Sequence, residues 1–492
     1  MKEILHSPYK KFFLFGLLCI VISSWFSMGY QQMDEHFMIL EFSNFRLGLA
    51  PQNTIPWEYT EKIRPSLQPT IANTVFQVFH AIGIHSPFFH VFVLRLLAGV
   101  LAWFVSCKIA LRFAATMIDE TVRKWWIMSV SCLWFMSYLS VRFSSENFAG
   151  FTLMAGLLVV PGIFKRGKIM ATNAQWFLSG LLLASAFYFR FQIAFSIIGI
   201  LLWLLLYARP LWKAYVFLLL GALVAVGVNL LLDHWFYNAW VLTPFNYFEA
   251  NIVKDAASTY GTTPWYDYIV LFATQGIPPI SWILLVLFFI ALVKKPMQLM
   301  MFVFIPFILG HMIVPHKEFR FIFPMILPFL ALSFSGLQEV WNSIKNRKWL
   351  IPAFRVLVVF NLVLMAYRCF WPASNTHSYY KYLYNYAQDK PVHLITIGRG
   401  IFDEGYNQIT LYRPKYLTED TTDNEAYPAL INTQNADSVL VMSYHTSLPY
   451  HDPRYTEQLL YVHLPQFLLH NNFNDWQSRS DIWSLWLLRK KK

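Results

Sequence analysis

The amino-acid sequence predicts an all-α polytopic membrane protein that ends in a small α/β domain outside the membrane. Hydrophobic residues make up 57% of the 492 positions and charged residues only 13%, against roughly 25% charged residues in a soluble globular domain. Apolar stretches long enough to span a bilayer recur along the first three quarters of the chain. After residue 371 the composition becomes polar, and short strand-like runs replace the long apolar ones.

About eleven transmembrane helices are predicted, several of them close to the minimum spanning length of about 17 residues. They cover residues 12–30, 88–111, 125–140, 147–164, 175–190, 191–207, 213–232, 278–293, 297–314, 322–336 and 350–371. Residues 71–84 are also apolar, but we expect an interfacial or re-entrant helix there, because counting them as a span inverts every later loop. With this topology, Lys and Arg concentrate in the short loops on the side of the N-terminus, as the positive-inside rule requires.

This topology divides the chain into a membrane region, residues 1–371, and a C-terminal α/β domain, residues 372–492. Long external loops are predicted at 31–87 and 233–277. Both loops and the C-terminal domain are placed on the non-cytoplasmic side. Strands of the C-terminal domain are predicted at 393–397, 438–442 and 485–488.

The basic charge of the chain is explained by membrane orientation. The formal net charge is +12, but most cations lie in short clusters between apolar runs, as they do in membrane proteins. We therefore expect the lipid bilayer as a partner and no nucleic acid. The four cysteines show no metal-ligand spacing and are expected to be packing residues.

Acidic residues gather directly after the first predicted span. Asp34, Glu35 and Glu41 stand among apolar residues, and on an α-helix Asp34 and Glu41, seven positions apart, share a face. A carboxylate beside apolar residues at a membrane surface is suited to act as a general base. The alternative is a helix N-terminus whose acids complement the helix dipole.

A second polar group lies between two apolar runs. Four polar or charged residues fall within five positions: His316, Lys317, Glu318 and Arg320. Charged groups at a membrane boundary are costly and often functional, and cations at a helix N-terminus form a good anion site. The alternative is ordinary anchoring of the chain at the interface.

Two arginines and one aromatic-rich loop complete the candidates. Arg142 and Arg190 fall at external ends of predicted spans, where each is suited either to pair with a phosphate or to extend to lipid headgroups. The loop 233–277 is dense in aromatic side chains. Such side chains stack on sugar rings, but an interfacial belt is the simpler interpretation.

Four sequence blocks, in order, resemble those of the dolichyl-phosphate-mannose-dependent mannosyltransferases, and within them the GPI mannosyltransferase branch. The blocks are Asp34-Glu35-x-Phe37-x-x-Leu40-Glu41; Trp57-Glu58-Tyr59 with Ile63-Arg64 and Pro69; Asp233-x-x-Phe236-Tyr237-x-x-Trp240-x-x-Thr243-Pro244-x-Asn246, followed by Tyr260-Gly261-x-x-Pro264-Trp265; and His316-Lys317-Glu318-x-Arg320-Phe321. They extend from residue 34 to residue 321, and so cover most of the membrane region. Each block lies on the predicted external side.

The resemblance implies a GT-C-type glycosyltransferase fold with an external active site. The donor is expected to be a polyprenyl-phosphate sugar, in the first place mannose, and the reaction an inverting displacement at the anomeric carbon. Asp34 is the expected general base and Glu35 a second catalytic residue. Cations are expected to stabilise the departing phosphate. The expected substrate-binding residues, which include the two arginines discussed above, are Glu41, Trp57, Glu58, Arg64, Arg142, Arg190, Asn246, Tyr260, His316, Lys317, Glu318 and Arg320.

No cofactor is expected, because the leaving group is a phosphate monoester and the site lacks an Asp-x-Asp pair. A divalent ion held by Asp34 and Glu35 is the alternative. The chain also departs from the family pattern. Pro65 stands where the family usually has Ser, and Ala149 replaces an acid, with Glu146 appearing earlier. The C-terminal domain shows no match, so acceptor contacts are not carried over.

The predicted activity specifies neither the acceptor nor the membrane in which the protein resides. The chain contains no Asn-x-Ser/Thr sequence, which favours a bacterial inner membrane with a periplasmic active site over the endoplasmic reticulum. The acceptor is then a lipid-linked glycan, a glycolipid or a protein. A sugar-lipid transporter or flippase is the main alternative, but transporters place ionisable residues near the bilayer midplane. A non-catalytic subunit of a glycan-assembly machine is the other alternative.

Overall fold

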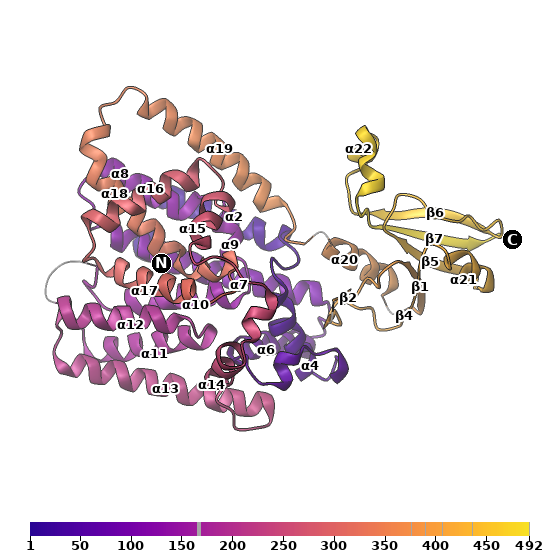
Figure 1. Ribbon diagram of the computed structural model, residues 1–492, viewed down its shortest axis with the longest axis horizontal. Coiled ribbons are helices and arrows are strands. Elements are labelled where there is room, and N and C mark those ends of the chain that lie inside the picture. Colours follow the sequence, from indigo (N-terminus) through magenta and orange to yellow (C-terminus); the bar gives the residue numbers. More distant parts are fainter. Residues whose placement is uncertain (165–168, 375, 389, 406, 435, 492) are drawn as a thin grey trace. The chain divides into compact units, whose positions relative to one another are not determined.

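The computed structural model describes residues 1–164, 169–374, 376–388, 390–405, 407–434 and 436–491 (Figure 1). The chain forms two compact units. The first comprises Met1–Ser27, Trp57–Phe76 and Phe92–Trp371, and the second comprises Met28–Pro56, Gln77–Val91 and Pro372–Lys492. The predicted external loop 31–87 is thus divided between the two units, and parts of it belong with the C-terminal region.

The first unit is helical. Its elements, two of which continue across the boundary between the units (α6 and α7), are α1 (Lys2–Leu5), α2 (Lys10–Phe26), α5 (Trp57–Thr60), α6 (Leu67–Ala81), α7 (Pro87–Ala114), α8 (Glu120–Cys132), α9 (Met136–Ser140), α10 (Ser145–Leu158), α11 (Asn173–Phe189), α12 (Ile193–Trp203), η3 (Leu204–Ala208), α13 (Trp212–Tyr237), α14 (Thr243–Phe248), η4 (Glu249–Val253), η5 (Ala256–Tyr260), α15 (Asp267–Gln275), α16 (Ile280–Lys294), α17 (Leu299–Ile313), η6 (Phe319–Met325), α18 (Ile326–Ile344) and α19 (Leu350–Phe370).

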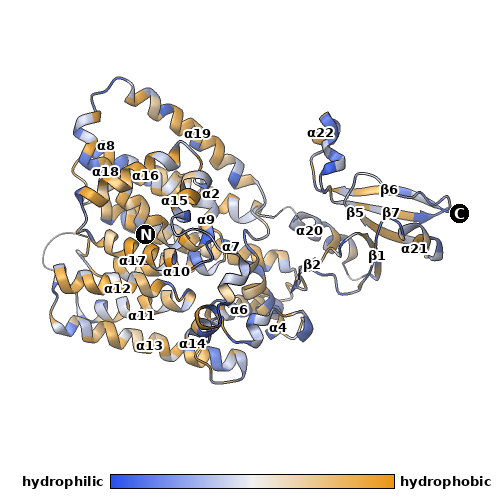
Figure 2. Ribbon diagram, viewed as in Figure 1, coloured by the Kyte–Doolittle hydropathy of each residue, from blue (hydrophilic) through white to orange (hydrophobic). Residues whose placement is uncertain are grey.

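Every predicted span coincides with helical structure, but the predicted number of spans is not confirmed. In the described part of the chain, four helical segments are long and apolar enough to cross a membrane: α7, α13, η6 with α18, and α19. The pair α16 and α17, bent by 113°, raises the number to five at most. The other predicted spans are shorter helices, and one of them breaks between Cys132 and Met136. Figure 2 shows the hydrophobic residues distributed along these helices.

Helices of the first unit approach one another closely at glycines. A Cβ atom on Gly180 of α11 would collide with the carbonyl oxygen of Leu218 in α13, and one on Gly221 of α13 would collide with that of Phe177 in α11. Gly150 of α10 similarly faces Pro324 of η6, to whose Cα a Cβ would lie 2.8 Å away. Small residues at helix crossings are how membrane helices bring their backbones together.

The second unit contains a five-stranded mixed sheet in the order β4-β1-β5-β7-β6. Its first three strands, β4 (Leu417–Thr422), β1 (Val392–Ile397) and β5 (Ser438–Ser443), are parallel; β7 (Ser484–Lys490) runs antiparallel to β5 and to β6 (Tyr455–Val462). The three predicted strands are present as β1, β5 and β7. The α21 helix (Tyr427–Thr433) packs on the face that carries Ile395, Val441 and Leu488.

The remaining elements of the second unit come from both ends of the chain. They are α3 (Met33–Glu35), η1 (His36–Glu41), α4 (Phe42–Arg46), η2 (Gln52–Thr54), α20 (Thr376–Ala387), β2 (Asp403–Glu404), β3 (Asn407–Gln408), α22 (Gln466–Leu469) and η7 (Phe473–Arg479). The segment η1 is π-helical. A π-helical turn contains an extra residue and is frequent at functional sites.

The glycine crossing of α11 and α13 yields a stability prediction. Gly221→Ala places a Cβ against a carbonyl oxygen, so we expect a destabilisation of about 1–3 kcal/mol, typical of overpacking. Gly227 lies in the same helix, but a Cβ there meets no atom within 4 Å, so Gly227→Ala should stabilise the helix by up to about 1 kcal/mol. Thermal unfolding in detergent measures both variants, and equal effects at the two positions would contradict this account of the crossing.

Candidate functional site

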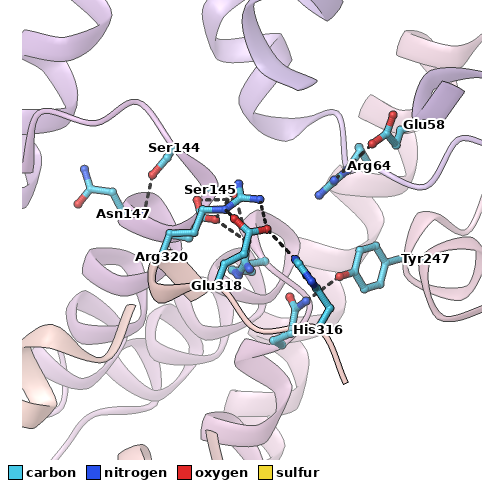
Figure 3. A network of polar contacts seen from close by, with 12 residues as sticks. Glu58, Arg64, Ser144, Ser145, Asn147, Tyr247, His316, Glu318 and Arg320 are labelled. Atoms are coloured by element: carbon cyan, nitrogen blue, oxygen red, sulfur yellow. Dashed lines mark hydrogen bonds and ion pairs between the residues drawn. The ribbon is translucent and has the colours of Figure 1, made fainter. Parts of the chain in front are cut away.

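A network of charged side chains lies at the start of α10 and of η6 (Figure 3). Glu146, in the first turn of α10, forms an ion pair with Arg190 at 2.8 Å and a longer one with Arg320 at 3.6 Å. All three side chains are at most 10% exposed. Buried charges persist only where partners neutralise them, and here one carboxylate serves two guanidinium groups.

Glu318 extends this network. Its carboxylate accepts two hydrogen bonds from Arg320, from Nε at 2.8 Å and from Nη2 at 2.9 Å, a bidentate pair. The Nε2 atom of His316 lies 3.2 Å from the same carboxylate, and its Nδ1 atom lies 3.1 Å from the carbonyl oxygen of Gly261. Both ring nitrogens therefore face oxygen atoms, one of a carboxylate and one of the backbone.

Phe321 lies beneath the two arginines of the network. The guanidinium carbon of Arg190 is 4.7 Å from the centre of its ring, and that of Arg320 is 5.2 Å from it. Such cation–π contacts hold a guanidinium group in place without consuming its N–H donors. The Nε atom of Arg190 is buried and has no hydrogen-bond partner within the described residues. One guanidinium donor of the network thus stays unused by the described residues.

Lys317 joins two of the sequence blocks. Its Nζ atom donates hydrogen bonds to the carbonyl oxygens of Val314 at 2.9 Å and of Thr263 at 3.1 Å, while the Thr263 N–H donates to Pro315 at 3.0 Å. Burial lowers the pKa of Lys317, and Asp267 acts in the opposite direction. The Tyr260-to-Trp265 block is therefore tied to the block that contains His316. Tyr260 itself is 58% exposed.

Arg64 is held by contacts between the second and third blocks. The buried carboxylate of Asp233 accepts hydrogen bonds from the Ser66 N–H at 2.8 Å, from the Ser66 hydroxyl at 2.6 Å and from Thr243 at 2.8 Å. The Tyr237 hydroxyl donates to the carbonyl oxygen of Arg64 at 2.6 Å. These contacts fix the backbone on both sides of Pro65.

Glu58 and Asn246 hold Arg64 and the turn that carries it. Arg64 lies 3.7 Å from the nearly buried Glu58, and in Figure 3 its guanidinium group is on the side that faces His316. Asn246 donates to the carbonyl oxygens of Glu61 and Lys62 at 3.4 and 3.3 Å, so it supports the same turn. Trp57 is 43% exposed.

Arg142 is buried in the first unit. Its Nη2 atom donates to the carbonyl oxygen of Ser27 at 2.6 Å and to the Ser27 hydroxyl at 2.8 Å, and its guanidinium carbon is 4.9 Å from the centre of the Tyr138 ring. Arg142 and Arg190 thus both pair inside the unit. The alternative that they extend to lipid headgroups does not describe them.

The acidic group at residues 34–41 lies in the second unit. Asp34 and Glu35, on α3, are half-buried. Glu41 is buried, at 1% exposure. The expectation that Asp34 and Glu41 share a face of a regular α-helix is wrong, because the π-helical η1 separates them.

The carboxylate of Glu41 takes part in internal hydrogen bonds. It lies 2.9 Å from His36 Nε2 and accepts from the N–H groups of Thr410 at 2.8 Å and Leu411 at 3.0 Å. Burial opposes ionisation of Glu41, but the contacts with His36, Leu411 and Thr410 prevail and lower its pKa. This carboxylate is therefore already occupied by protein groups.

Two buried acids are absent from the predicted site residues: Glu146 of the charged network and Asp233, which holds the backbone next to Arg64. Glu146 was noted only as a departure from the family pattern, and Asp233 only as the first residue of a block. Asp233 directly follows a run of three leucines, which is a sequence signal for a functional acid, whereas Glu146 stands between Ser145 and Asn147 and carries no such signal. Across the described residues, no group of three or more His, Cys, Asp or Glu side chains is arranged to hold a metal ion.

Comparisons with known proteins give one family match and several relatives. Residues 12–402 match the model of the Alg9-like mannosyltransferase family. The chain is 26% identical over 347 residues to GPI alpha-1,2-mannosyltransferase 3 of Bos taurus and of Homo sapiens, which covers 68% of this chain and 59% and 57% of those proteins. It is 24% identical over 327 residues to mannosyltransferase APTG1 of Arabidopsis thaliana, covering 66% and 58%. The matches thus span less than two thirds of these relatives.

The fold is shared with a solved structure. ArnT from Cupriavidus metallidurans bound to undecaprenyl phosphate matches with a TM-score of 0.52 and 12% sequence identity, over 98% of each chain. Its apo structure matches with a TM-score of 0.51 and 12% identity, over 88% of this chain and 92% of that one. At this identity the likeness shows a common fold, that of the GT-C glycosyltransferases.

Proposed function

Because this chain belongs to the Alg9-like mannosyltransferase family, we propose that it transfers a sugar, in the first place mannose, from a polyprenyl-phosphate donor to an acceptor. The acceptor is a lipid-linked glycan, a glycolipid or a protein on the non-cytoplasmic side of the membrane. The curated relatives carry mannosyltransferase names, and the matching ArnT structure contains a polyprenyl phosphate. The names support the transfer of mannose, and the ArnT structure supports a lipid-phosphate donor.

The position of η6 is the observation that carries this proposal. This short helix contributes Arg320 to the charged network. It also contributes Phe319, Ile322 and Phe323 to the wall of an apolar cavity of about 180 Å³. The other walls are apolar side chains of α15, α16, α17 and α18, with the Tyr268 hydroxyl as the polar exception. A site for an anion and an apolar cavity share this one helix. Together they suit a ligand with a phosphate head and a hydrocarbon chain.

The phosphate of the donor is assigned to the network of Arg190, Arg320 and His316. Bidentate guanidinium groups suit a phosphate, and the carboxylates of Glu146 and Glu318 already orient the two arginines. As the bond between the anomeric carbon and the phosphate oxygen breaks, negative charge grows on the phosphate. Fixed cations stabilise that charge more in the transition state than in the bound donor.

The acceptor hydroxyl oxygen forms the new bond to the anomeric carbon in the same step. Its proton passes to a base, a role that we assign to Asp34 because of its place in the first-loop motif, with Glu35 beside it. Displacement from the face opposite the phosphate inverts the anomeric configuration. The products are the glycosylated acceptor and the polyprenyl phosphate, so no redox partner takes part.

Arg64, Lys317 and the remaining motif residues support these groups. Arg64 is kept in place by Asp233, Tyr237 and Asn246 through the turn that carries it, and we assign it to the donor phosphate. Lys317 contributes positive charge while its N–H donors hold the neighbouring loop. Glu58 orients Arg64. Arg142 is assigned to electrostatic support, and Trp57 and Tyr260, both exposed, to stacking on sugar rings.

We also propose the membrane in which the protein resides. The absence of Asn-x-Ser/Thr sequences favours a bacterial inner membrane with a periplasmic active site. The curated relatives named above come from eukaryotes and give that assignment no specific support. A lumenal site in the endoplasmic reticulum is the alternative.

The transferase assignment predicts the behaviour of Asp34→Asn. Wild-type protein in nanodiscs, given polyprenyl-phosphate mannose and a native lipid extract, should release polyprenyl phosphate with or without EDTA. Asp34→Asn should release it at least about 100-fold more slowly, because the base is lost. Asp255→Asn, at an exposed position of the first unit, is the control and should keep the wild-type rate. Equal release by Asp34→Asn and wild type would exclude Asp34 as the base, and donor transport without release would indicate the flippase.

The apolar cavity predicts how the enzyme responds to the donor chain. Ile308→Trp fills a cavity that we assign to the hydrocarbon chain. It should raise the KM for a C55 donor roughly tenfold, the equivalent of about two buried methylene groups, and leave unaffected a donor with a C1 (methyl) chain, which does not reach the cavity. Val286→Trp, on an exposed position of α16, is the matched control. A similar change in KM for both chain lengths would show that the chain does not occupy this cavity.

A further inference from the structure

The helical segment that carries Asp34 belongs to the same compact unit as the C-terminal region. The elements α3, η1 and α4 follow one another without a break from Met33 to Arg46. The segment that they contact, residues 409–412, lies in the connection between β1 and β4. More than 360 residues of sequence separate these two parts of the unit.

The carboxylate of Glu41 joins the helical segment to the connection between β1 and β4. Both oxygens of Glu41 are used: Oε1 lies 2.9 Å from His36 Nε2 and accepts from the N–H groups of Thr410 and Leu411 at 2.8 and 3.0 Å, and Oε2 accepts from the Thr410 hydroxyl. One turn later, Asn44 donates to the same hydroxyl at 2.8 Å. We name this set of contacts the Glu41 clamp.

The clamp is enclosed by aromatic side chains. The ring of His36 stacks on that of Tyr412, with centroids 5.5 Å apart and planes at 20°, and Tyr412 stacks on Phe88 at 4.7 Å. Tyr412 is 2% exposed. Water therefore has little access to Glu41, and a hydrogen bond lost there leaves buried donors without a partner.

The π-helical turn explains why Glu41 reaches both His36 and the C-terminal segment. The extra residue of η1 brings positions 36 and 41 onto one side of the turn. A regular α-helix pairs positions three or four apart instead. The irregularity thus directs Glu41 to Thr410, while Asp34 and Glu35 stay half-exposed at the beginning of the segment.

We propose that Glu41 is a positioning residue, which fixes the helical segment that carries Asp34 to the C-terminal region. The substrate-binding role expected for Glu41 from the sequence is replaced by this one. The C-terminal region is then a working part of the transferase, because its residues Thr410 and Leu411 hold the catalytic segment. This inference rests on the proposed function insofar as Asp34 acts as the base.

The test uses the full-length protein in nanodiscs and four variants. Glu41→Gln removes the negative charge and replaces one acceptor oxygen by an NH2 group, which cannot accept the hydrogen bond of the Thr410 hydroxyl. Thr410→Val removes the hydroxyl with little change of shape, Thr410→Ser keeps it, and Glu41→Gln/Thr410→Val combines the losses. Asp452→Asn is the matched control, because Asp452 is also a buried acid of this unit, bonded to Arg454 and absent from the clamp.

Kinetics separate positioning from substrate binding. Glu41→Gln should lower kcat about 10- to 100-fold and leave the donor KM within twofold of wild type. Thr410→Val should lower kcat less, Thr410→Ser should restore it, and the double variant should be no slower than Glu41→Gln, because the two groups act as one contact. Asp452→Asn should lower the unfolding temperature without changing kcat.

Hydrogen exchange of the resting protein, with no substrate, tests the clamp itself. Amides of residues 33–46 and 409–412 should exchange faster in Glu41→Gln than in wild type. Unchanged exchange, unchanged kcat, or a raised donor KM with normal kcat would each overturn the inference. A wild type that is inactive with every donor would remove the proposed function and the positioning role with it, whereas exchange would still report whether the clamp exists.

Discussion

The carboxylate of Glu146 forms ion pairs with two buried guanidinium groups, those of Arg190 and Arg320, inside a bundle of apolar helices. Removing charge from water is costly, so this arrangement persists only while the partners stay together. It holds η6 against α10, where Gly150 allows the close approach of Pro324. The same contacts keep two cations near a third group, His316. The groups of the proposed anion site are therefore held in place by the packing of the bundle.

Hydropathy predicted where helices form but not how they break. The break after Cys132 is marked by Leu133-Trp134-Phe135, which contains neither Gly nor Pro, so no local signal announces it. In the second unit the predicted strands are the interior ones, β1, β5 and β7, which are apolar. The strands that were missed, β4 and β6, are the edges of the sheet; β4 reads Leu-Thr-Glu-Asp-Thr-Thr, a polar pattern that edge strands tolerate.

Motif order predicted His316, Glu318 and Arg320 as candidate site residues, whereas the part played by Glu146 became visible only in the fold. His316, Glu318 and Arg320 interact as near neighbours in sequence. The pairing of Glu146 with Arg190 links positions 44 apart, and the Glu41 clamp links positions 369 apart. In the clamp two of the four partners of Glu41 are backbone N–H groups, which every residue type except proline supplies. Sequence alone therefore gives no sign of such a contact.

The proposed function requires that the network around Arg320 receives the phosphate of a lipid donor. The phosphorus-31 resonance of polyprenyl phosphate in nanodiscs reports on this directly, without turnover or acceptor. We expect the resonance to shift and saturate with wild-type protein and to stay at its free position with Arg320→Gln. Arg355→Gln, at an exposed position of α19, should behave as wild type. An equal shift with Arg320→Gln and wild type would contradict the account, because the phosphate would then bind elsewhere.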